Sequence, residues 1–329
     1  MNVLVPLATV VGLFLLGFFG AESGLGRTFG VMLPYIAITL FLGGLVWRVL
    51  GWANVPVPFR IPTTCGQQKS FDWIKQEKLD NPDTTLRVVG RMALEVLLFR
   101  SLLSNTTSEI MGKRKLVYGI ALSLWLAAIA FHWSLLIVLI RHIRLFTVPV
   151  PFWVTFMQKA EGFHHFGEPV FYVTSVVFVG ALGYLLFRRL FIGQVRYISL
   201  LGDYFPLFLL LGIGLSGFWL RHLDRTDIEG VKQLAVGLIT FNPVVPETVA
   251  PLFFAHLFLV CVLLSYIPFS KLVHMGGVFL SPTRNLANNN RVKRHINPWD
   301  YSVKVHTYAE YEDELRDKMK GAGIPVERQ

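Results

Sequence analysis

The sequence of 329 residues has few charged residues and almost no cysteine. Only 16% of its residues are Asp, Glu, Lys or Arg, against about 25% in soluble globular domains. Its two cysteines, Cys65 and Cys261, belong to no C-x-x-C pair. These absences exclude a disulfide framework, a thiolate zinc site, a cysteine-held iron–sulfur cluster and covalent c-type haem attachment.

The chain is rich in long apolar runs instead. It is 53% hydrophobic with a mean hydropathy of +0.52, which argues against a soluble protein. Each of six stretches is close to the ~20 residues that a membrane-spanning helix needs. They cover residues 3–21, 28–47, 116–140, 169–187, 204–220 and 249–269. We predict an all-α integral membrane bundle of six transmembrane helices. It should be surrounded by membrane lipid, and no nucleic acid is expected as a partner.

Positive charge is distributed unevenly over the connections between these stretches. Residues 48–115 contain eleven Lys and Arg, residues 188–203 contain three and the tail from Lys271 contains ten, which together make 24 of the 31. Because positive loops stay in the cytoplasm, a multi-pass protein of the cytoplasmic membrane is predicted, with both termini cytoplasmic. The first stretch is interpreted as a helix and not a signal peptide, because no positive charge precedes it.

This arrangement divides the chain into four parts. They are two N-terminal transmembrane helices (1–50), a cytoplasmic loop (51–115), a four-helix core (116–276) and a basic cytoplasmic tail (277–329). The spacing of apolar residues predicts an amphipathic helix over 86–103, which either lies on lipid headgroups or docks a cytoplasmic partner. A charged helix is expected near 308–320.

Four of the nine histidines belong to two of the predicted spans, with His132 and His256 inside them and His142 and His274 just beyond their ends. His132 and His142 are about 15 Å apart along the third span, and His256 and His274 about 27 Å apart along the sixth. Since these spans run antiparallel, His132 should meet His274 and His142 should meet His256. The two levels are too far apart to share one zinc or copper ion. Two stacked haem b groups, each held by two imidazoles, fit this spacing, and four unrelated histidines bonded across helices are the alternative.

Several motifs resemble a known family at this point. They are Phe131-His132-Trp133, Arg141-His142-Ile143-Arg144, and His256 and His274 on the last span. Together they resemble the NarI-like cytochrome b, the gamma subunit of respiratory nitrate reductase, over about residues 116–276. The basic loop and tail are most similar to the DsrM-type cytochromes of the DsrMKJOP complex, which serves sulfate and sulfur respiration. The membrane subunit of heterodisulfide reductase is a close alternative.

The resemblance implies a respiratory electron-transfer subunit with no bond-making site of its own. Menaquinol would be oxidised at an outer haem held by His142 and His256. Electrons would pass to an inner haem held by His132 and His274, then to a cytoplasmic iron–sulfur subunit like DsrK, with other subunits completing the complex.

Two further sets of residues are candidates on the outer side. Lys159, Glu161 and His164 lie in the connection after the third span and are the predicted quinol site, or else part of a polar loop on headgroups. Arg141 and Arg144 flank His142 and could pair with haem propionates, or else be ordinary interfacial charges.

Two other classes of function stay open from the sequence. A proton-coupled transporter would use the histidines as a proton relay, although no internal repeat is evident and Asp and Glu are nearly absent from the spans. A structural anchor for a cytoplasmic partner would not need them.

Overall fold

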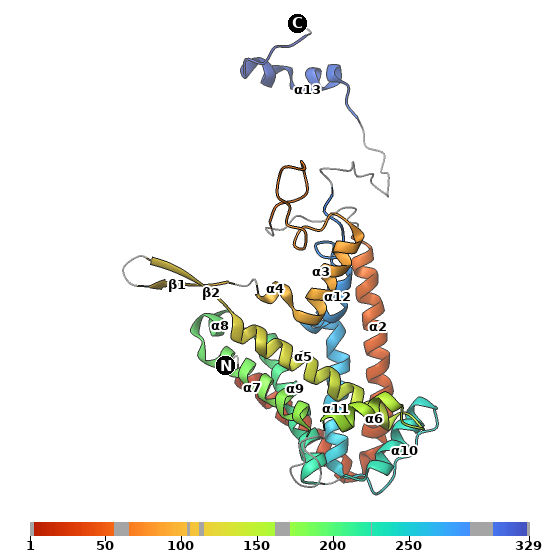
Figure 1. Ribbon diagram of the computed structural model, residues 1–329. Helices are drawn as coiled ribbons and strands as arrows, with labels where there is room; N and C mark the ends of the chain where they lie inside the picture. The colour runs from red at the N-terminus through yellow and green to blue at the C-terminus, as the bar shows by residue number, and fades with distance from the viewer. Residues whose placement is uncertain are drawn as a thin grey trace.

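The structure is a computed structural model that describes residues 3–55, 66–103, 106–111, 115–161, 172–224, 226–289 and 305–327. Within these residues, six helices are long and apolar enough to cross a membrane, and they form one bundle (Figure 1). The spans are Leu4–Leu25, Thr28–Ala53, Leu122–Leu145, Val173–Phe191, Leu201–His222 and Pro251–Phe269. The predicted all-α membrane bundle is confirmed.

The long helices of the bundle are α1 (Leu4–Gly20), α2 (Leu33–Ala53), α5 (Leu122–His142), α7 (Val173–Phe191), α9 (Leu201–His222) and α11 (Pro251–Tyr266). The shorter helices are α3 (Thr85–Leu98), α4 (Arg100–Leu103), α6 (Phe152–Glu161), α8 (Gly193–Ile198), α10 (Ile228–Ile239), α12 (His274–Leu280) and α13 (Tyr308–Gly321). Helices α3, α4 and α12 lie at one end of the bundle, which we call the α3 end (Figure 1). Helices α6 and α10 lie at the other, the α10 end.

Helix α11 is at the centre of the bundle, where it packs against α1, α2 and α9. Helix α5 packs mainly against α7. Gly17 of α1 lies so close to α11 that a Cβ atom there would be 2.9 Å from the Cα of Ala255, so a larger residue would push the two helices apart. Val10, Leu209 and Leu259 form a buried cluster that joins α1, α9 and α11.

The start of the third span differs from the prediction. Residues 116–120 belong to a two-stranded antiparallel hairpin of β1 (Thr106–Met111) and β2 (Lys115–Ile120), in which Thr106 pairs with Ile120 and Met111 with Lys115. Helix α5 begins only at Leu122, and the hairpin projects away from the bundle (Figure 1). The sequence did not separate strand from helix because the apolar run continues from one into the other.

The last span is also interrupted. Helix α11 ends at Tyr266 and gives way to two short 3-10 turns, Ile267–Phe269 and Lys271–Val273, separated by Ser270 in an extended conformation. The prediction of one helix from His256 to His274 is therefore wrong. Proline cannot continue a regular helix, since it lacks the N–H and crowds the preceding turn, and Pro268 lies at this break. His274 is the first residue of α12.

The loop at the α3 end is tied to the segment that follows α12. Glu95 forms an ion pair with Arg284, and the backbone N–H of Asn288 donates to the carbonyl oxygen of Pro82 at 2.6 Å. The predicted amphipathic helix is two helices, α3 and α4, separated by Phe99. The charged helix expected near 308–320 is α13, which stands clear of the bundle in Figure 1.

Candidate functional site

One pair of histidines meets at the α3 end. The ring centres of His132 on α5 and His274 on α12 are 6.1 Å apart, and the ring planes are inclined at 79°. Two imidazoles that bind one metal through bonds of about 2 Å place their ring centres roughly 6 Å apart. The observed separation therefore suits a metal between the two rings.

The second pair lies toward the α10 end. His142 is the last residue of α5, and His256 lies in the second turn of α11. The turn that follows α5 packs against α10, and α11 begins 12 residues after α10 ends, so both histidines lie toward this end of the bundle. The structure thus brings His132 and His274 together and places His142 and His256 toward the opposite end, as the antiparallel spans suggest, while their role as haem ligands stays a prediction.

All four imidazoles use Nδ1 in a hydrogen bond. The Nδ1 atoms of His132, His142 and His274 lie 2.8, 2.7 and 2.9 Å from the carbonyl oxygens of Ala128, Val138 and Lys271, respectively. A carbonyl oxygen can only accept, so each of these Nδ1 atoms is the donor. A histidine that donates from Nδ1 binds a metal through Nε2, and the hydrogen bond fixes its tautomer and orientation.

His256 is held differently, by side chain and backbone of the neighbouring helix α9. Its Nδ1 lies 2.9 Å from the hydroxyl oxygen of Ser216, which is itself 2.7 Å from the carbonyl oxygen of Gly212. The serine hydroxyl donates to that carbonyl and so accepts from His256. A Cβ atom on Gly217 would lie 3.1 Å from Cε1 of His256, so this glycine makes room for the imidazole ring.

The helices that provide the two pairs are not packed closely on each other. Among the described residues, α5 contacts α4, α6 and α7, whereas α11 contacts α1, α2 and α9. None of the four histidine residues is fully buried: His132 and His256 are half-buried, and His142 and His274 are exposed. A planar group held between two imidazoles needs both features, so these residues fit a bis-imidazole haem.

A bare metal ion would need a larger set of ligands. Within the described part of the chain, no group of three or more His, Cys, Asp or Glu side chains lies close enough to hold one. A porphyrin supplies four of the six iron ligands itself, so two imidazoles complete the set.

Arg141, one of the predicted propionate partners, is buried in a polar cluster at the end of α5, near the α10 end of the bundle. Its guanidinium donates to the hydroxyl of Ser175 at 3.0 Å and lies 3.5 Å from the carboxylate of Glu161, which also accepts from Thr174. The guanidinium also lies over the ring of Tyr172, 4.0 Å from its centre. The structure thus joins two residues that the sequence assigned to different tasks, Arg141 and Glu161.

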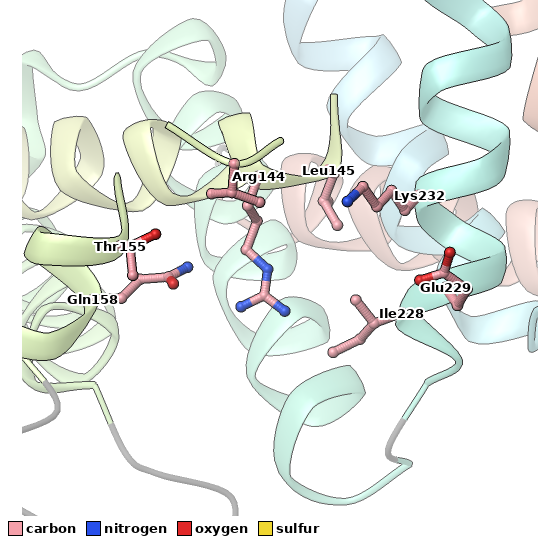
Figure 2. Close-up of a pocket in the computed structure, with 8 residues that line it drawn as sticks. Arg144, Leu145, Thr155, Gln158, Ile228, Glu229 and Lys232 are labelled. Carbon is pink, nitrogen blue, oxygen red and sulfur yellow. The ribbon is translucent and has the colours of Figure 1, made fainter. Parts of the chain in front are cut away.

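Arg144, the other predicted propionate partner, lines a cavity of about 360 Å³ (Figure 2). The cavity lies between the end of α5, α6 and the start of α10, and its lining residues are Arg144, Leu145, Val150, Thr155, Gln158, Ile228, Glu229 and Lys232. The Nε2 atom of Gln158 is buried and has no hydrogen-bond partner. A buried donor without a partner is costly, so the cavity suits a ligand with an oxygen acceptor.

Helix α10 is fixed at its start by Asp227. The carboxylate accepts from the N–H of Glu229 at 3.1 Å and from the hydroxyl of Thr248 at 2.6 Å. The hydrogen bond from Thr248, followed by those from backbone N–H groups, lowers the pKa of Asp227. The ionised N-cap keeps the first turn of α10, with its cavity residues Ile228 and Glu229, in place.

The other residues predicted for the quinol site do not line this cavity in the described structure. Lys159 and Glu161 lie on helix α6 and not in a loop, so that prediction of local structure is wrong. Lys159 is exposed and does not line the cavity. His164 lies outside the described residues.

Sequence reasoning missed several contributors to these sites. Ser216, Gly217, Thr155 and Gln158 carry no distinctive motif, and only the packing of helices brings them to the imidazole or the cavity. The short spacing between Gln158 and Glu161 on one helix is the only signal that could have linked the cavity to the predicted quinol residues.

The fold and these sites define a multi-pass membrane protein with two levels of paired histidines. The nitrate reductase gamma subunit family matches residues 102–295. The chain belongs to this family.

Similar proteins cover most of the chain. The Hdr-like menaquinol oxidoreductase cytochrome b-like subunit of Archaeoglobus fulgidus is 46% identical over 283 residues, 84% of each chain. The protein of the same name from Archaeoglobus profundus is 41% identical, over 82% of this chain and 81% of the relative. The nitrate reductase gamma chain of Bacillus subtilis is 24% identical over 82% of this chain and 98% of its own length.

Proposed function

We propose that this chain is the dihaem cytochrome b subunit of a menaquinol-oxidising complex of the cytoplasmic membrane. The observation that carries the proposal is the set of four histidines, paired at two levels and each anchored through Nδ1. The names of the Archaeoglobus relatives, which combine menaquinol oxidoreductase with cytochrome b-like subunit, support it.

Each imidazole pair has one task in this proposal. His132 and His274 hold the inner haem b, and His142 and His256 hold the outer one. When bound, haem b accepts and releases one electron at a time. The protein sets the potential of each haem through the Nδ1 hydrogen bonds, burial and nearby charge.

The cavity at the α10 end is the proposed site of menaquinol oxidation. Its volume of about 360 Å³ is within the range of small-ligand sites. Leu145, Val150 and Ile228 offer apolar contact to the quinol ring, while Thr155 and Gln158 offer hydrogen-bond donors to its oxygens. Arg144 extends into the same cavity between Gln158 and Ile228 (Figure 2). There it can bind a quinol oxygen or a propionate of the outer haem.

Oxidation of menaquinol to menaquinone releases two electrons and two protons. Glu161 is the proposed proton acceptor, because its Oε1 atom is buried without a hydrogen-bond partner. Arg141 pairs with the other carboxylate oxygen of Glu161 and keeps this group in position. Because Arg141 directly precedes His142, the pair also links Glu161 to the proposed outer haem ligand. Lys159 and His164 stay secondary candidates for the same site.

The uneven distribution of positive charge supports the direction of the pathway. It predicts that the α3 end faces the cytoplasm, with both chain termini on that side. Electrons would then leave the inner haem at the α3 end for a cytoplasmic iron–sulfur subunit of the DsrK or heterodisulfide reductase kind. The name Hdr-like for the relatives favours such a complex over nitrate reductase. We place the complex in sulfate or sulfur respiration because the basic loop and tail resemble those of the DsrM-type cytochromes.

The first experiment is to count haems in the purified complex. A pyridine haemochrome assay with reduced-minus-oxidised spectra should give about two b haems per chain. His142→Ala should remove the outer haem and the reaction with menaquinol, and His132→Ala should remove the inner haem and block transfer to the cytoplasmic acceptor. His306→Ala, which alters a histidine of the tail segment before α13, is the matched control and should retain both haems.

A folded wild-type complex without b haem would overturn the proposal, and favour the transporter or anchor alternatives. Equal loss of both haems in His132→Ala and His142→Ala, with the protein still folded, would show that the pairing is wrong.

A further inference from the structure

Phe99 has an unusual backbone conformation at the end of the amphipathic helix α3. Its φ of 49° lies in the left-handed region, which residues other than glycine rarely adopt. In this conformation its N–H still caps the helix by donating to the carbonyl oxygen of Glu95, while the chain turns into α4. A strained residue of this kind persists only where surrounding contacts hold it, and it often lies at a functional site.

The turn at Phe99 brings its ring to one of the proposed haem ligands. The centres of the Phe99 and His132 rings are 4.8 Å apart, with the planes inclined at 71° in an edge-to-face arrangement. Phe131 makes a similar contact with His132 at 4.6 Å. Such contacts favour defined orientations of the ring planes. The imidazole of His132 is therefore oriented by Phe99 from the α3 segment as well as by its own helix.

The corner between α3 and α4, which we define as residues 97–101, is fixed to the helix of His132. The indole Nε1 atoms of Trp125 and Trp133 on α5 donate to the carbonyl oxygens of Leu98 and Leu97 at 2.8 and 3.1 Å. These carbonyls lie in the last turn of α3, where no helical partner is available. The indoles satisfy them and hold the corner on α5.

The same corner is also fixed to the segment that follows His274. Glu95 accepts from the backbone N–H of Ser101 at 3.0 Å and forms the ion pair with Arg284, which lies four residues after the end of α12. The corner is thus joined to α5, which carries His132, and through Glu95 to the segment after α12, which carries His274.

We propose that Phe99 is a positioning residue for the inner haem, which holds the His132 ring nearly perpendicular to the ring of His274 and keeps water from it. The inference rests on the proposed function and goes beyond it. It assigns to the loop at the α3 end a direct influence on the haem from which electrons leave. A partner that binds α3 would then act on the inner haem through this corner.

The test compares variants of Phe99 in the purified, haem-loaded complex. EPR of the oxidised protein reports the angle between the two axial imidazole planes, and a redox titration reports the potential of each haem. In Phe99→Ala we expect a changed g-maximum for the inner haem and a lower potential, because water stabilises the oxidised, more positive state. A tenfold change in the redox equilibrium corresponds to about 59 mV for one electron.

Three further variants separate the ring from the backbone. Phe99→Gly suits the left-handed conformation but lacks the ring, so it should reproduce the haem effect of Phe99→Ala without its strain. Phe99→Tyr should restore the wild-type EPR signal and potential. Trp125→Phe removes one anchor of the corner, and its effect on the inner haem should be in the same direction but smaller.

The outcomes distinguish the two proposals. An inner haem with wild-type EPR and potential in both Phe99→Ala and Phe99→Gly would overturn the positioning role and leave the proposed function intact. If Phe99→Ala does not fold, the comparison of Phe99→Gly with Phe99→Tyr decides in the same way. Absence of b haem from the wild-type complex would instead refute the proposed function. The outer haem serves as an internal control and should not change.

Discussion

The hydroxyl oxygen of Ser216 on α9 lies 2.9 Å from Nδ1 of His256 on α11. His256 is the one member of the four whose Nδ1 partner, in the described structure, is a side chain of another helix. The other three imidazoles are held by carbonyl oxygens close in sequence. The outer pair therefore depends on correct packing of α9 against α11, and mutation can test that dependence without changing a ligand.

Ser216→Ala removes the hydroxyl acceptor of His256. Loss of such a supporting hydrogen bond typically lowers metal affinity by about 10- to 100-fold. We expect lower occupancy and a shifted potential of the outer haem, with the inner haem unchanged, in a redox titration. Ser265→Ala is the control. Ser265 lies on α11, the helix of His256, and its hydroxyl donates to the carbonyl oxygen of Cys261 and not to the imidazole. An outer haem unaffected by Ser216→Ala would contradict the role of this serine.

Gly217→Ala should disturb the same imidazole by contact. The added methyl group would lie 3.1 Å from Cε1 of His256, closer than ordinary van der Waals contact, and the ring cannot retreat without losing its bond to Ser216. We expect loss of outer haem absorbance. In Gly183→Ala on α7, by contrast, the new methyl group meets no atom within 4 Å, so this variant should be neutral or stabilising by about 1 kcal/mol. Equal behaviour of the two variants would disprove the steric argument.

Gln158→Leu tests the cavity as the menaquinol site. The substitution keeps the approximate volume and removes the buried Nε2 donor. Loss of one hydrogen bond worth about 1.4 kcal/mol corresponds to a tenfold rise in KM for the quinol. Steady-state kinetics with a menaquinol analogue should show this rise, while both haem spectra stay unchanged. Met157→Leu on the same helix does not alter a cavity residue and should leave KM as it is. A Gln158→Leu enzyme with wild-type KM would place the quinol elsewhere.

The ion pair between Glu95 and Arg284 should stabilise the α3 end. Both side chains are partly buried, so neutralising Glu95 leaves the charge of Arg284 partly buried without its partner. This costs about 1–3 kcal/mol of stability. Glu95→Gln should increase hydrogen exchange at residues 97–101 and lower the unfolding temperature of the complex. Asp313→Asn alters a more exposed pair on α13 and should change the stability very little. Unchanged exchange at the corner in Glu95→Gln would show that the indole anchors suffice.

Most of the bundle could be predicted from the sequence, because a bilayer imposes both the length and the apolar character of each span. The levels of the histidines followed from the same rule, since helical rise converts residue spacing into depth. His132 and His274 come together although the predicted continuous helix between His256 and His274 is broken. Antiparallel direction and depth were enough, and the helical phase was not needed.

The parts that failed depend on contacts between distant segments. Residues 116–120 are apolar enough for a span, yet they pair with β1, because the competition between strand and helix is decided by the partner strand. The left-handed Phe99 and the bond between Ser216 and His256 have no counterpart in local sequence. Both require the helices to be in place first.

The interruption between α11 and α12 has a mechanical consequence. In an unbroken helix His256 and His274 would be rigidly linked, and any tilt of that helix would displace both imidazoles together. The extended Ser270 instead separates the last span into two helical parts, α11 with His256 and α12 with His274, which can move independently. A displacement of α12 can therefore change the position of His274, in the proposed inner haem site, while His256, in the proposed outer site, keeps its geometry.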